Sequence, residues 1–442
     1  MKRLKVALLN DNHKEMLRII EESNKKLRDI THQCVYLEPL RKSRNNMPST
    51  ANLRTIRRSA TSLHRALIIG KGWRCACKKY HMASLRLEPR SDLLKSRGLA
   101  LASPLTFRVL LATSQAPSSY LATPQWYDVE IRPSLQIVSG AATTASCTTD
   151  IRTETGRGVE SAIESREMAT VAKSAISTHS PSTSATAIID LCSLIFRSPR
   201  SDKMLGFLVD EMEADHKHYL SRTDNTFSCK PQSQTLADRL LVSPGDHSPS
   251  GSLSRKDRLD IAVTLASSVL QLDGTCWLNQ HWSSNDIYFH IQNMSNPGSD
   301  ATQPYLPWRS CTTEHETAVD SGNLMPGQQF IRSNALFALG LTLVELCFGK
   351  TIGSMQKPED ESQAQDEVAQ RINCAFRLLE SGWIWKEMGE TYEDVVRRCL
   401  RQPFDVRDLD LDNKEVQQQV YDTVVVPLKE NVDNFLGLLR IR

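Results

Sequence analysis

One segment near the C-terminal end limits what this chain can fold into more than any other. Residues 333–349 are apolar on almost every side of a helix, and Glu345 is the one charged residue among them. A helix without a polar face must be surrounded by protein, so we expect it at the centre of a domain, with Gly349 as its C-cap. It is shorter than the roughly 18 apolar residues that mark a membrane-spanning helix, so we expect no membrane span.

Composition narrows the class of protein. The chain has 442 residues, of which 40% are hydrophobic and 24% are charged. These proportions are usual for a globular protein, and the length suggests about two or three domains. The 54 basic and 51 acidic residues leave a net charge of +3. Such a balance lacks the positive excess that binds nucleic acid, so we expect no nucleic-acid partner.

The cysteine pattern indicates whether the protein is in a reducing or an oxidising compartment. The sequence has eleven, without the spacing of a disulfide framework, and Cys347, Cys374 and Cys399 fall inside apolar helical patterns. Reduced, buried thiols fit these positions better than disulfides. The apolar run at residues 6–9 is too short for the core of a signal peptide. We therefore expect an intracellular, cytoplasmic protein.

Periodicity divides the chain into five segments. Helical stripes occur at 12–30 and 52–69, alternating strand-like patterns at 73–87, 106–112 and 126–131, and short helical patterns at 187–196 and 204–212. The predicted segments are an N-terminal helical segment (1–69), a small β-containing lobe (70–138), a Ser/Thr-rich insertion expected to be flexible (139–186), a lobe connection and hinge (187–250) and a helical domain (251–442).

The helical domain has clear start signals. Ser254 with Asp257 forms a capping pattern ahead of an apolar helical stripe, and Thr391 with Asp394 offers a second one. The last two helices carry apolar stripes at Val416, Val420 and Val424, and then at Leu428, Val432, Phe435 and Leu439. These patterns predict a mainly helical C-terminal half.

Three stretches of this half resemble the helical lobe of protein kinases. Residues 252–262 resemble the step from the kinase hinge to the helix before the catalytic loop. Residues 334–350, which end Glu-Leu-Cys-Phe-Gly-Lys, resemble the central helix of that lobe, and Cys399-Leu400 with Pro403 and Arg407 resembles a later kinase segment. The resemblance implies a degenerate protein-kinase-like α+β fold, with a small β-containing N-lobe and a mainly helical C-lobe.

A wider resemblance covers nearly the whole chain. It rests on Cys75-x-Cys77 with His81, Asp190-Leu191-Cys192, residues 205–208, Thr275-Cys276-Trp277-Leu278, Trp282 and Asp286-Ile287-Tyr288-Phe289. Together these residues are similar to an uncharacterised domain family of filamentous fungi, which often follows helical segments related to prion-inhibition and HeLo-type domains. The resemblance implies a fungal origin and a degenerate kinase-like core, and it implies no known reaction.

The residues that phosphoryl transfer needs are missing from the sequence. A kinase requires a glycine-rich phosphate loop, a lysine on a strand, magnesium ligands and an aspartate base. No G-x-G-x-x-G and no V-A-I-K occurs, and Arg86 is the nearest substitute for the lysine. No His-Arg-Asp, Asp-Phe-Gly or Ala-Pro-Glu occurs either. We therefore predict that the chain is not an enzyme.

The resemblance assigns speculative remnant positions to a few residues. If residues 286–289 occupy the place of the kinase Asn-Ile-Leu-Leu, Asp286 replaces the metal-binding asparagine and His281 stands at the base position. The central-helix aspartate that supports the catalytic loop then falls on Ala335. Arg86 and Asp286 are the candidate nucleotide-binding positions, with no catalytic residue and no cofactor expected.

Other groups of residues give weaker indications of a metal or ligand site. Cys75, Cys77 and His81 could converge as ligands, but the C-x-C spacing is not the usual zinc spacing and no fourth ligand is marked, so packed thiols and no metal are expected. The cluster at residues 215–218 favours a solvated loop or helix end over a metal site. Glu345 is expected to pair with a basic residue. Five tryptophans are expected to fill gaps between helices: Trp277, Trp282, Trp308, Trp383 and Trp385.

Two functions remain open from the sequence. The first is a non-catalytic, pseudokinase-like interaction and signalling module of a fungal protein, with a protein partner that the sequence does not name. The alternative is a nucleotide- or metal-responsive switch that uses the remnant cleft. A ligand that stabilises the protein would favour the switch.

Overall fold

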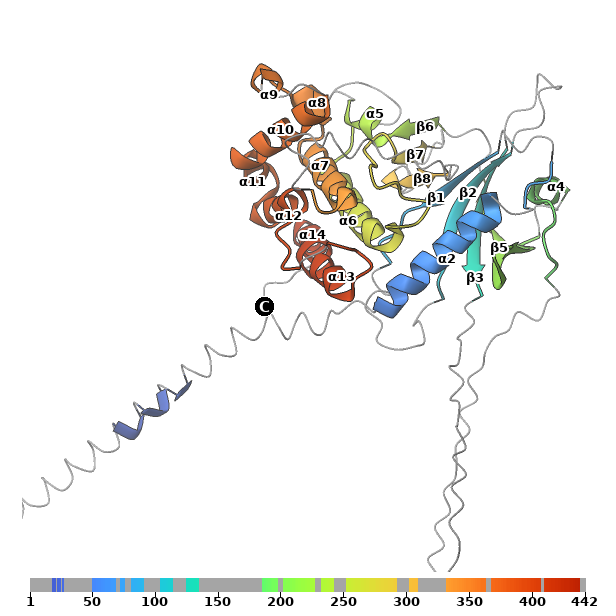
Figure 1. Ribbon diagram of the computed structural model, residues 1–442, viewed down its shortest axis with the longest axis horizontal. Coiled ribbons are helices and arrows are strands. Elements are labelled where there is room, and N and C mark those ends of the chain that lie inside the picture. The colour runs from blue at the N-terminus through green and yellow to red at the C-terminus, as the bar shows by residue number, and fades with distance from the viewer. Residues whose placement is uncertain are drawn as a thin grey trace, which may run out of the picture.

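The computed structural model places two bodies of secondary structure side by side, a sheet with α2 and a group of helices (Figure 1). The residues that the structure describes are 18–20, 22–24, 26–27, 50–68, 72–75, 81–90, 104–113, 125–134, 185–197, 202–226, 232–241, 252–291, 302–308, 331–362, 367–406 and 409–437. The predicted insertion at 139–186 lies almost wholly outside these residues, as does most of the predicted helix at 12–30.

Strands and helices alternate irregularly along the chain. The strands are β1 (Met82–Arg86), β2 (Phe107–Thr113), β3 (Gln125–Pro133), β4 (Met204–Asp210), β5 (Glu213–Thr226), β6 (Gln232–Thr235), β7 (Tyr288–Ile291) and β8 (Tyr305–Pro307). The helices are α2 (Thr50–Ile68), α4 (Leu191–Arg197), α5 (Leu236–Leu240), α6 (Arg255–Leu272), α7 (Asn334–Phe348), α8 (Ile352–Met355), α9 (Pro358–Ser362), α10 (Glu367–Glu380), α11 (Trp383–Met388), α12 (Glu390–Arg401), α13 (Lys414–Val420), the π-helix η4 (Tyr421–Val425) and α14 (Val426–Phe435).

Helix α7 forms the centre of the helical body, as the sequence predicts. Ser333 caps its N-terminus by accepting a hydrogen bond from the Leu336 amide, and Gly349 ends it at a φ of 64°. Such a left-handed residue favours glycine, which has no Cβ to clash with the preceding turn. The helix packs against α6, α11 and α12, and residues on all its sides are buried.

The sheet is a single antiparallel one that joins segments far apart in the sequence. Its strand order is β4-β5-β3-β2-β1-β8-β7-β6. Strands β2 and β3 pair over seven residue positions, from Phe107 opposite Ile131 to Thr113 opposite Gln125. Strand β8 then pairs with β1, so the sheet runs on from the predicted β-lobe into strands of the C-terminal half.

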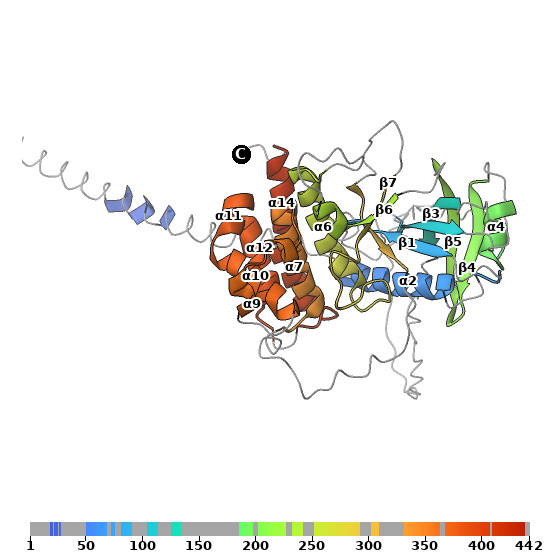
Figure 2. The same ribbon diagram turned by 90° about the horizontal axis from the view of Figure 1, so that it is seen from above.

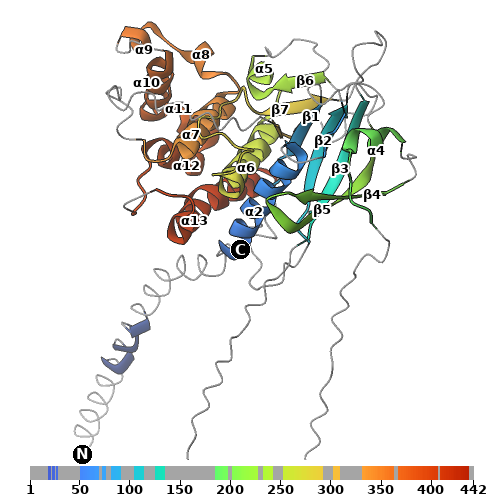
Figure 3. The same cartoon turned by 45° about the vertical axis from the view of Figure 1, so that its right-hand side comes forward.

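Helix α2 links the sheet to the helical body. Figures 2 and 3 show it along one face of the sheet, with one end reaching toward α6. The guanidinium of Arg57 donates two hydrogen bonds to the Leu270 carbonyl of α6, at 3.1 and 2.8 Å. The indole of Trp277 donates to the Ala60 carbonyl at 2.9 Å. One hydrophobic core therefore extends from Leu53 of α2 to Val432 of α14.

Several predicted elements are confirmed. Helix α2 and strands β2 and β3 lie where the patterns predict them. Ser254 and Asp257 form a complete capping box at the start of α6. Because the Ser254 hydroxyl and the Asp257 carboxylate each accept from the other's backbone amide, two donors that the helix leaves unpaired are satisfied.

Two predicted helix features are wrong. Residues 204–212 were expected to form a short helix, but 204–210 form strand β4, paired with β5. A short apolar run fits either structure, and pairing with a distant strand decides between them. Helix α12 begins at Glu390 after Gly389, so Thr391 and Asp394 lie inside the helix instead of capping it.

The thiols follow the sequence expectation in part. Cys347, Cys374 and Cys399 are free and buried, and burial raises the pKa of Cys347 and of Cys399 to about 12. Thiols held protonated in this way are unreactive. Cys276, in contrast, is disulfide-bonded, so the prediction of reduced thiols is wrong for that residue.

The architecture is mixed α+β with an antiparallel sheet, which confirms the predicted class. The kinase-like arrangement of that class stays a prediction. Within the described ranges, no helix combines the length and apolar character needed to cross a membrane.

Candidate functional site

The two predicted remnant positions lie at the end of β1 and just before β7, two strands of the sheet that β8 separates. Arg86 is the last residue of β1 and pairs with Tyr305 of β8, and Tyr305 in turn pairs with Tyr288 of β7. Two strand spacings therefore separate the backbones of Arg86 and Tyr288, about 10 Å. Asp286 precedes Tyr288 by two residues. The fold brings the two positions into one region of the molecule.

Asp286 serves the turn that contains it. Its carboxylate accepts a hydrogen bond from the Ser283 amide at 2.8 Å and another from the Ser283 hydroxyl at 3.2 Å. Its own amide donates to the Ser283 carbonyl at 2.9 Å. Aspartate commonly closes turns through such bonds. The Asp286 oxygen lone pairs that a metal ion would need are thus partly used in hydrogen bonds from Ser283.

Arg86 is also held by neighbours on the sheet. Its Nη2 donates to the Gln303 Oε1 at 3.0 Å, and its Nε lies 3.6 Å from the Glu88 Oε1. The side chain is half-buried. These contacts hold the guanidinium against the residues just before β8 and just after β1.

The loop between α6 and β7 rests on the start of α7. Trp282 is buried, and its indole Nε1 donates to the Ala335 carbonyl at 3.3 Å. His281, the position that the resemblance assigns to the base, is exposed, and its amide donates to the Asn279 Oδ1 at 3.1 Å. The loop is therefore held by the buried Trp282 ring and its hydrogen bond to the Ala335 carbonyl.

Glu345 has the basic neighbour that the sequence predicts. Its Oε1 accepts from the Ile352 amide at 3.1 Å and lies 4.0 Å from the Arg371 Nη2. Burial raises the pKa of Glu345, and the bonds from the Ile352 amide and Ser284 act against that rise. Both contacts tie α7 to elements that follow it, which is a structural role.

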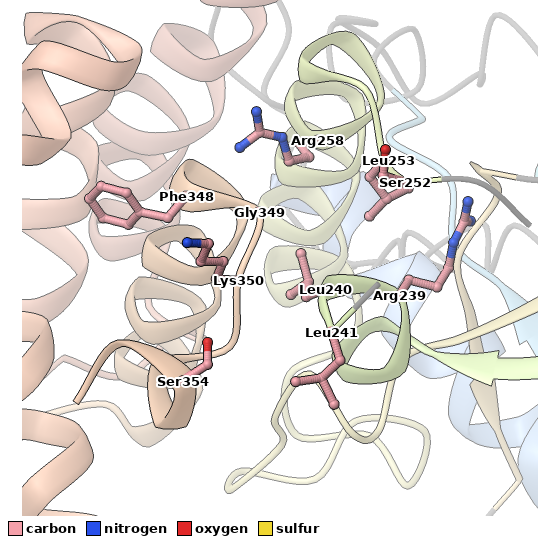
Figure 4. A pocket seen from close by; sticks show the side chains of 10 residues that line it. All are labelled: Arg239, Leu240, Leu241, Ser252, Leu253, Arg258, Phe348, Gly349, Lys350 and Ser354. Carbon is pink, nitrogen blue, oxygen red and sulfur yellow. The ribbon is translucent and has the colours of Figure 1, made fainter. Parts of the chain in front are cut away.

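A cavity of about 330 Å³ opens between α5, α6, the end of α7 and α8. Figure 4 shows Leu240 and Leu241 on one side of it and Phe348 and Lys350 on the other. The residues that line it are Arg239, Leu240, Leu241, Ser252, Leu253, Arg258, Phe348, Gly349, Lys350 and Ser354. Sequence reasoning missed this cavity because its walls come from three separate segments that only the fold brings together.

The charge of the cavity is positive. Arg258 donates from its Nη1 to the carbonyls of Leu346 and Cys347, so it closes the end of α7. The guanidinium of Arg239 lies 4.8 Å over the Phe289 ring, and burial lowers the pKa of Arg239. Lys350 is exposed. Because no carboxylate is among the lining residues, the cavity suits an anionic ligand better than a cation.

The tryptophans divide into two groups. Trp277 and Trp282 are buried between helices, as predicted, and Trp308 is half-buried. Trp383 and Trp385 of α11 are each 54% exposed, so the interpretation as gap fillers is wrong for them. The Lys386 ammonium lies 4.7 Å over the Trp383 ring.

The other predicted clusters have mixed outcomes. Residues 215–218 lie in strand β5, so the expected loop or helix end is wrong. Within them the His218 Nε2 lies 2.9 Å from the Ser62 hydroxyl of α2. Cys75 and His81 do meet, with 2.9 Å between the Sγ and Nε2 atoms. Cys77 lies outside the described residues.

Comparison with known protein families identifies the domain. A family model described as a domain of unknown function, DUF7580, matches residues 50–435. No curated protein matches the chain, and no solved structure matches it. The matched range begins at the first residue of α2 and ends at the last residue of α14, so it includes both the sheet and the helical body. The chain belongs to this family, the DUF7580 domains of unknown function.

Proposed function

We propose that this chain is a non-catalytic interaction and signalling module of a fungal protein, with a protein-kinase-like arrangement of its C-terminal half. The observation that carries the non-catalytic part is the position of Asp286, whose carboxylate closes its own turn through Ser283. A phosphoryl-transfer site instead presents carboxylates to magnesium ions, which neutralise charge on the phosphates.

The order of elements supports the kinase-like part. Helix α6 leads into the loop at 273–287, β7 and β8 follow, and α7 lies behind that loop. This is the order that the resemblance of residues 252–262 and 334–350 implies. The fungal origin and a place near HeLo-type helical segments rest on the wider resemblance alone.

The interaction part rests on the surface of α11. Trp383 and Trp385 each expose about half of their area, although large aromatic side chains dominate the energetics of cores and interfaces. Tryptophan is also enriched among the few residues that supply most of the binding energy of protein interfaces. Residues two apart in a helix lie on different faces, so the two rings give the helical body two exposed aromatic contacts for a protein partner.

The expected result of removing this surface is loss of the partner. The double substitution Trp383→Ala with Trp385→Ala should weaken binding at least about 30-fold, because one such residue often contributes 2 kcal/mol or more. The measurement has two steps. The full chain is used to capture the partner from the protein's native cells, and the purified partner is then titrated by calorimetry into the wild-type chain and the variant.

The matched control changes exposed apolar side chains elsewhere. Ile189 is 64% exposed and Met212 is 77% exposed, and both lie in the half of the molecule that contains the sheet. The double substitution Ile189→Ala with Met212→Ala should leave binding unchanged. Equal affinity of the partner for the tryptophan variant and the control would rule out α11 as the docking surface.

A nucleotide-responsive switch is the second candidate, and the basic cavity favours it. Arg239, Arg258 and Lys350 supply positive charge, and Ser252 and Ser354 supply hydroxyls that can bind phosphate oxygens. Stabilisation by ATP that is lost on Lys350→Ala and kept on Asp286→Ala would support a switch at this cavity. No stabilisation, or loss only on Asp286→Ala, would contradict it.

A further inference from the structure

Three metal-ligand side chains meet beside the sheet. Cys75 and His81 flank the approach to β1, and Cys192 is the second residue of α4. The two Sγ atoms and a ring nitrogen of His81 all lie within 4.8 Å of one another. The Cys75 Sγ and the His81 Nε2 are the closest pair, at 2.9 Å.

Backbone contacts hold the two contributing segments together independently of these side chains. The Leu191 amide donates to the Gly72 carbonyl at 2.6 Å, and the Arg74 amide donates to the Asp190 Oδ1 at 3.3 Å. These bonds fix the start of α4 against residues 72–75. Contacts other than their own side chains therefore bring Cys75 and Cys192, two of the three ligands, close together.

The orientation of His81 suits a ligand. The Trp73 ring packs on the imidazole with 4.4 Å between centroids and 35° between planes. An imidazole binds a metal ion through the lone pair of one ring nitrogen, and this packing fixes the plane in which the ring nitrogens lie.

The three ligand residues differ in solvent exposure, which bears on how a metal ion would be coordinated. His81 is 3% exposed and Cys192 is 5% exposed, whereas Cys75 is half-buried. The cluster is therefore closed on the protein side and open at Cys75. A tetrahedral ion held by three protein ligands keeps its fourth position for water or one more ligand on the open side.

We propose that Cys75, His81 and Cys192 bind a zinc ion that ties the segment before β1 to α4. Thiolate and imidazole ligands select zinc over magnesium or calcium, which take oxygen ligands. Zinc bond lengths of about 2.3 Å to sulfur and 2.0–2.1 Å to nitrogen separate tetrahedral ligand atoms by about 3.5–3.8 Å. Shifts of about 1 Å bring the present arrangement to that geometry.

Sequence reasoning missed the third ligand. Cys75, Cys77 and His81 form a local pattern, but its spacing is not the usual one for zinc and marks no further ligand. Cys192 lies more than 100 residues further along the chain, and only the packing of α4 brings it to the cluster.

The test is metal analysis of the full chain purified under reducing conditions. Wild-type protein equilibrated with Zn²⁺ and passed through a desalting column should retain one zinc ion per chain by mass spectrometry. Cys192→Ser and His81→Ala should each lower the retained zinc at least tenfold. Cys374→Ser, which changes a buried thiol remote from the cluster, should retain the wild-type amount.

A second readout does not depend on the variants folding. Wild-type protein loaded with Co²⁺ should show the visible bands of tetrahedral cobalt and thiolate-to-cobalt charge transfer. Three results would each overturn the proposal. Wild-type protein could retain no zinc after desalting, its cobalt spectrum could lack thiolate charge transfer, or Cys374→Ser and Cys192→Ser could lose equal amounts of zinc.

Discussion

Replacing Arg65 by alanine is expected to lower the free energy of unfolding by about 3 kcal/mol. The Arg65 guanidinium of α2 donates two hydrogen bonds to the Asp210 Oδ2, at 3.0 and 2.6 Å. The Asp210 side chain has no exposed area. Removal of the guanidinium leaves a buried carboxylate without its main counter-charge. An uncompensated buried charge destabilises a protein more than the replacement of both partners by apolar residues. Urea unfolding followed by circular dichroism measures the change.

The pH dependence of this effect follows from the carboxylate. Burial acts to raise the pKa of Asp210, but hydrogen bonds from Arg65, the Met212 amide and Ser62 outweigh it, so the pKa lies below its ordinary 3.8. The stabilisation is therefore fully present above that value and is lost as the pH falls through the lower folded-state pKa. The deficit of Arg65→Ala should shrink as the pH is lowered from 7 toward 3.

A neighbouring ion pair provides the control. Arg58 donates to the Glu213 Oε2 at 2.9 Å, but its side chain is 59% exposed. Because solvent screens such pairs, Arg58→Ala should cost less than about 1 kcal/mol. Equal losses in the two variants, or a deficit of Arg65→Ala that grows in acid, would contradict the structural role given to Asp210. The charged and titratable groups around this site are Arg58, Arg65, Asp210, Glu213, His216 and His218.

Replacing Gly340 by alanine is expected to destabilise the protein by about 1–3 kcal/mol through overpacking. Gly340 lies where α7 crosses α12. A Cβ atom there would stand 2.8 Å from the Leu400 Cδ2 and 3.0 Å from both the Leu400 Cγ and the Cys399 Cβ. The helices must move apart to admit it. Alanine in an open helix would instead be stabilising by about 0.5–1 kcal/mol.

Gly353 in α8 makes a direct comparison. A Cβ atom added at Gly353 meets nothing within 4 Å, so Gly353→Ala should be neutral or slightly stabilising in the same urea titration. A Gly340→Ala variant as stable as Gly353→Ala would show that the contact between α7 and α12 is looser than the structure has it.

Local patterns predicted the helical body well. The capping residue Ser254 and the C-cap Gly349 act through neighbours within a few residues, so the sequence contains the information. Strand β4 could not be distinguished from a helix, because its short apolar run acquires its strand form from pairing with β5. The continuous sheet depends on pairings such as Arg86 with Tyr305, which no local pattern indicates.

The candidate sites were less predictable for the same reason. Asp286 was recognised by resemblance, but its use in a turn depends on the geometry of Ser283. The basic cavity and the Cys75–His81–Cys192 cluster each combine segments that are distant in sequence. Exposure of Trp383 and Trp385 could not be inferred either, since tryptophan is usually buried among helices.

A thermal-unfolding titration with ATP, in the presence of Mg²⁺ or Mn²⁺, tests the central claim most directly. A nucleotide present at one hundred times its dissociation constant stabilises a protein by about 2.7 kcal/mol, which such an experiment resolves easily. With the Asp286 carboxylate used by its own turn, the unfolding temperature should be unchanged at millimolar ATP. A saturable, metal-dependent rise that Asp286→Ala abolishes would contradict the assignment of Asp286 to its own turn and would favour a nucleotide-responsive switch at the remnant position over the interaction module.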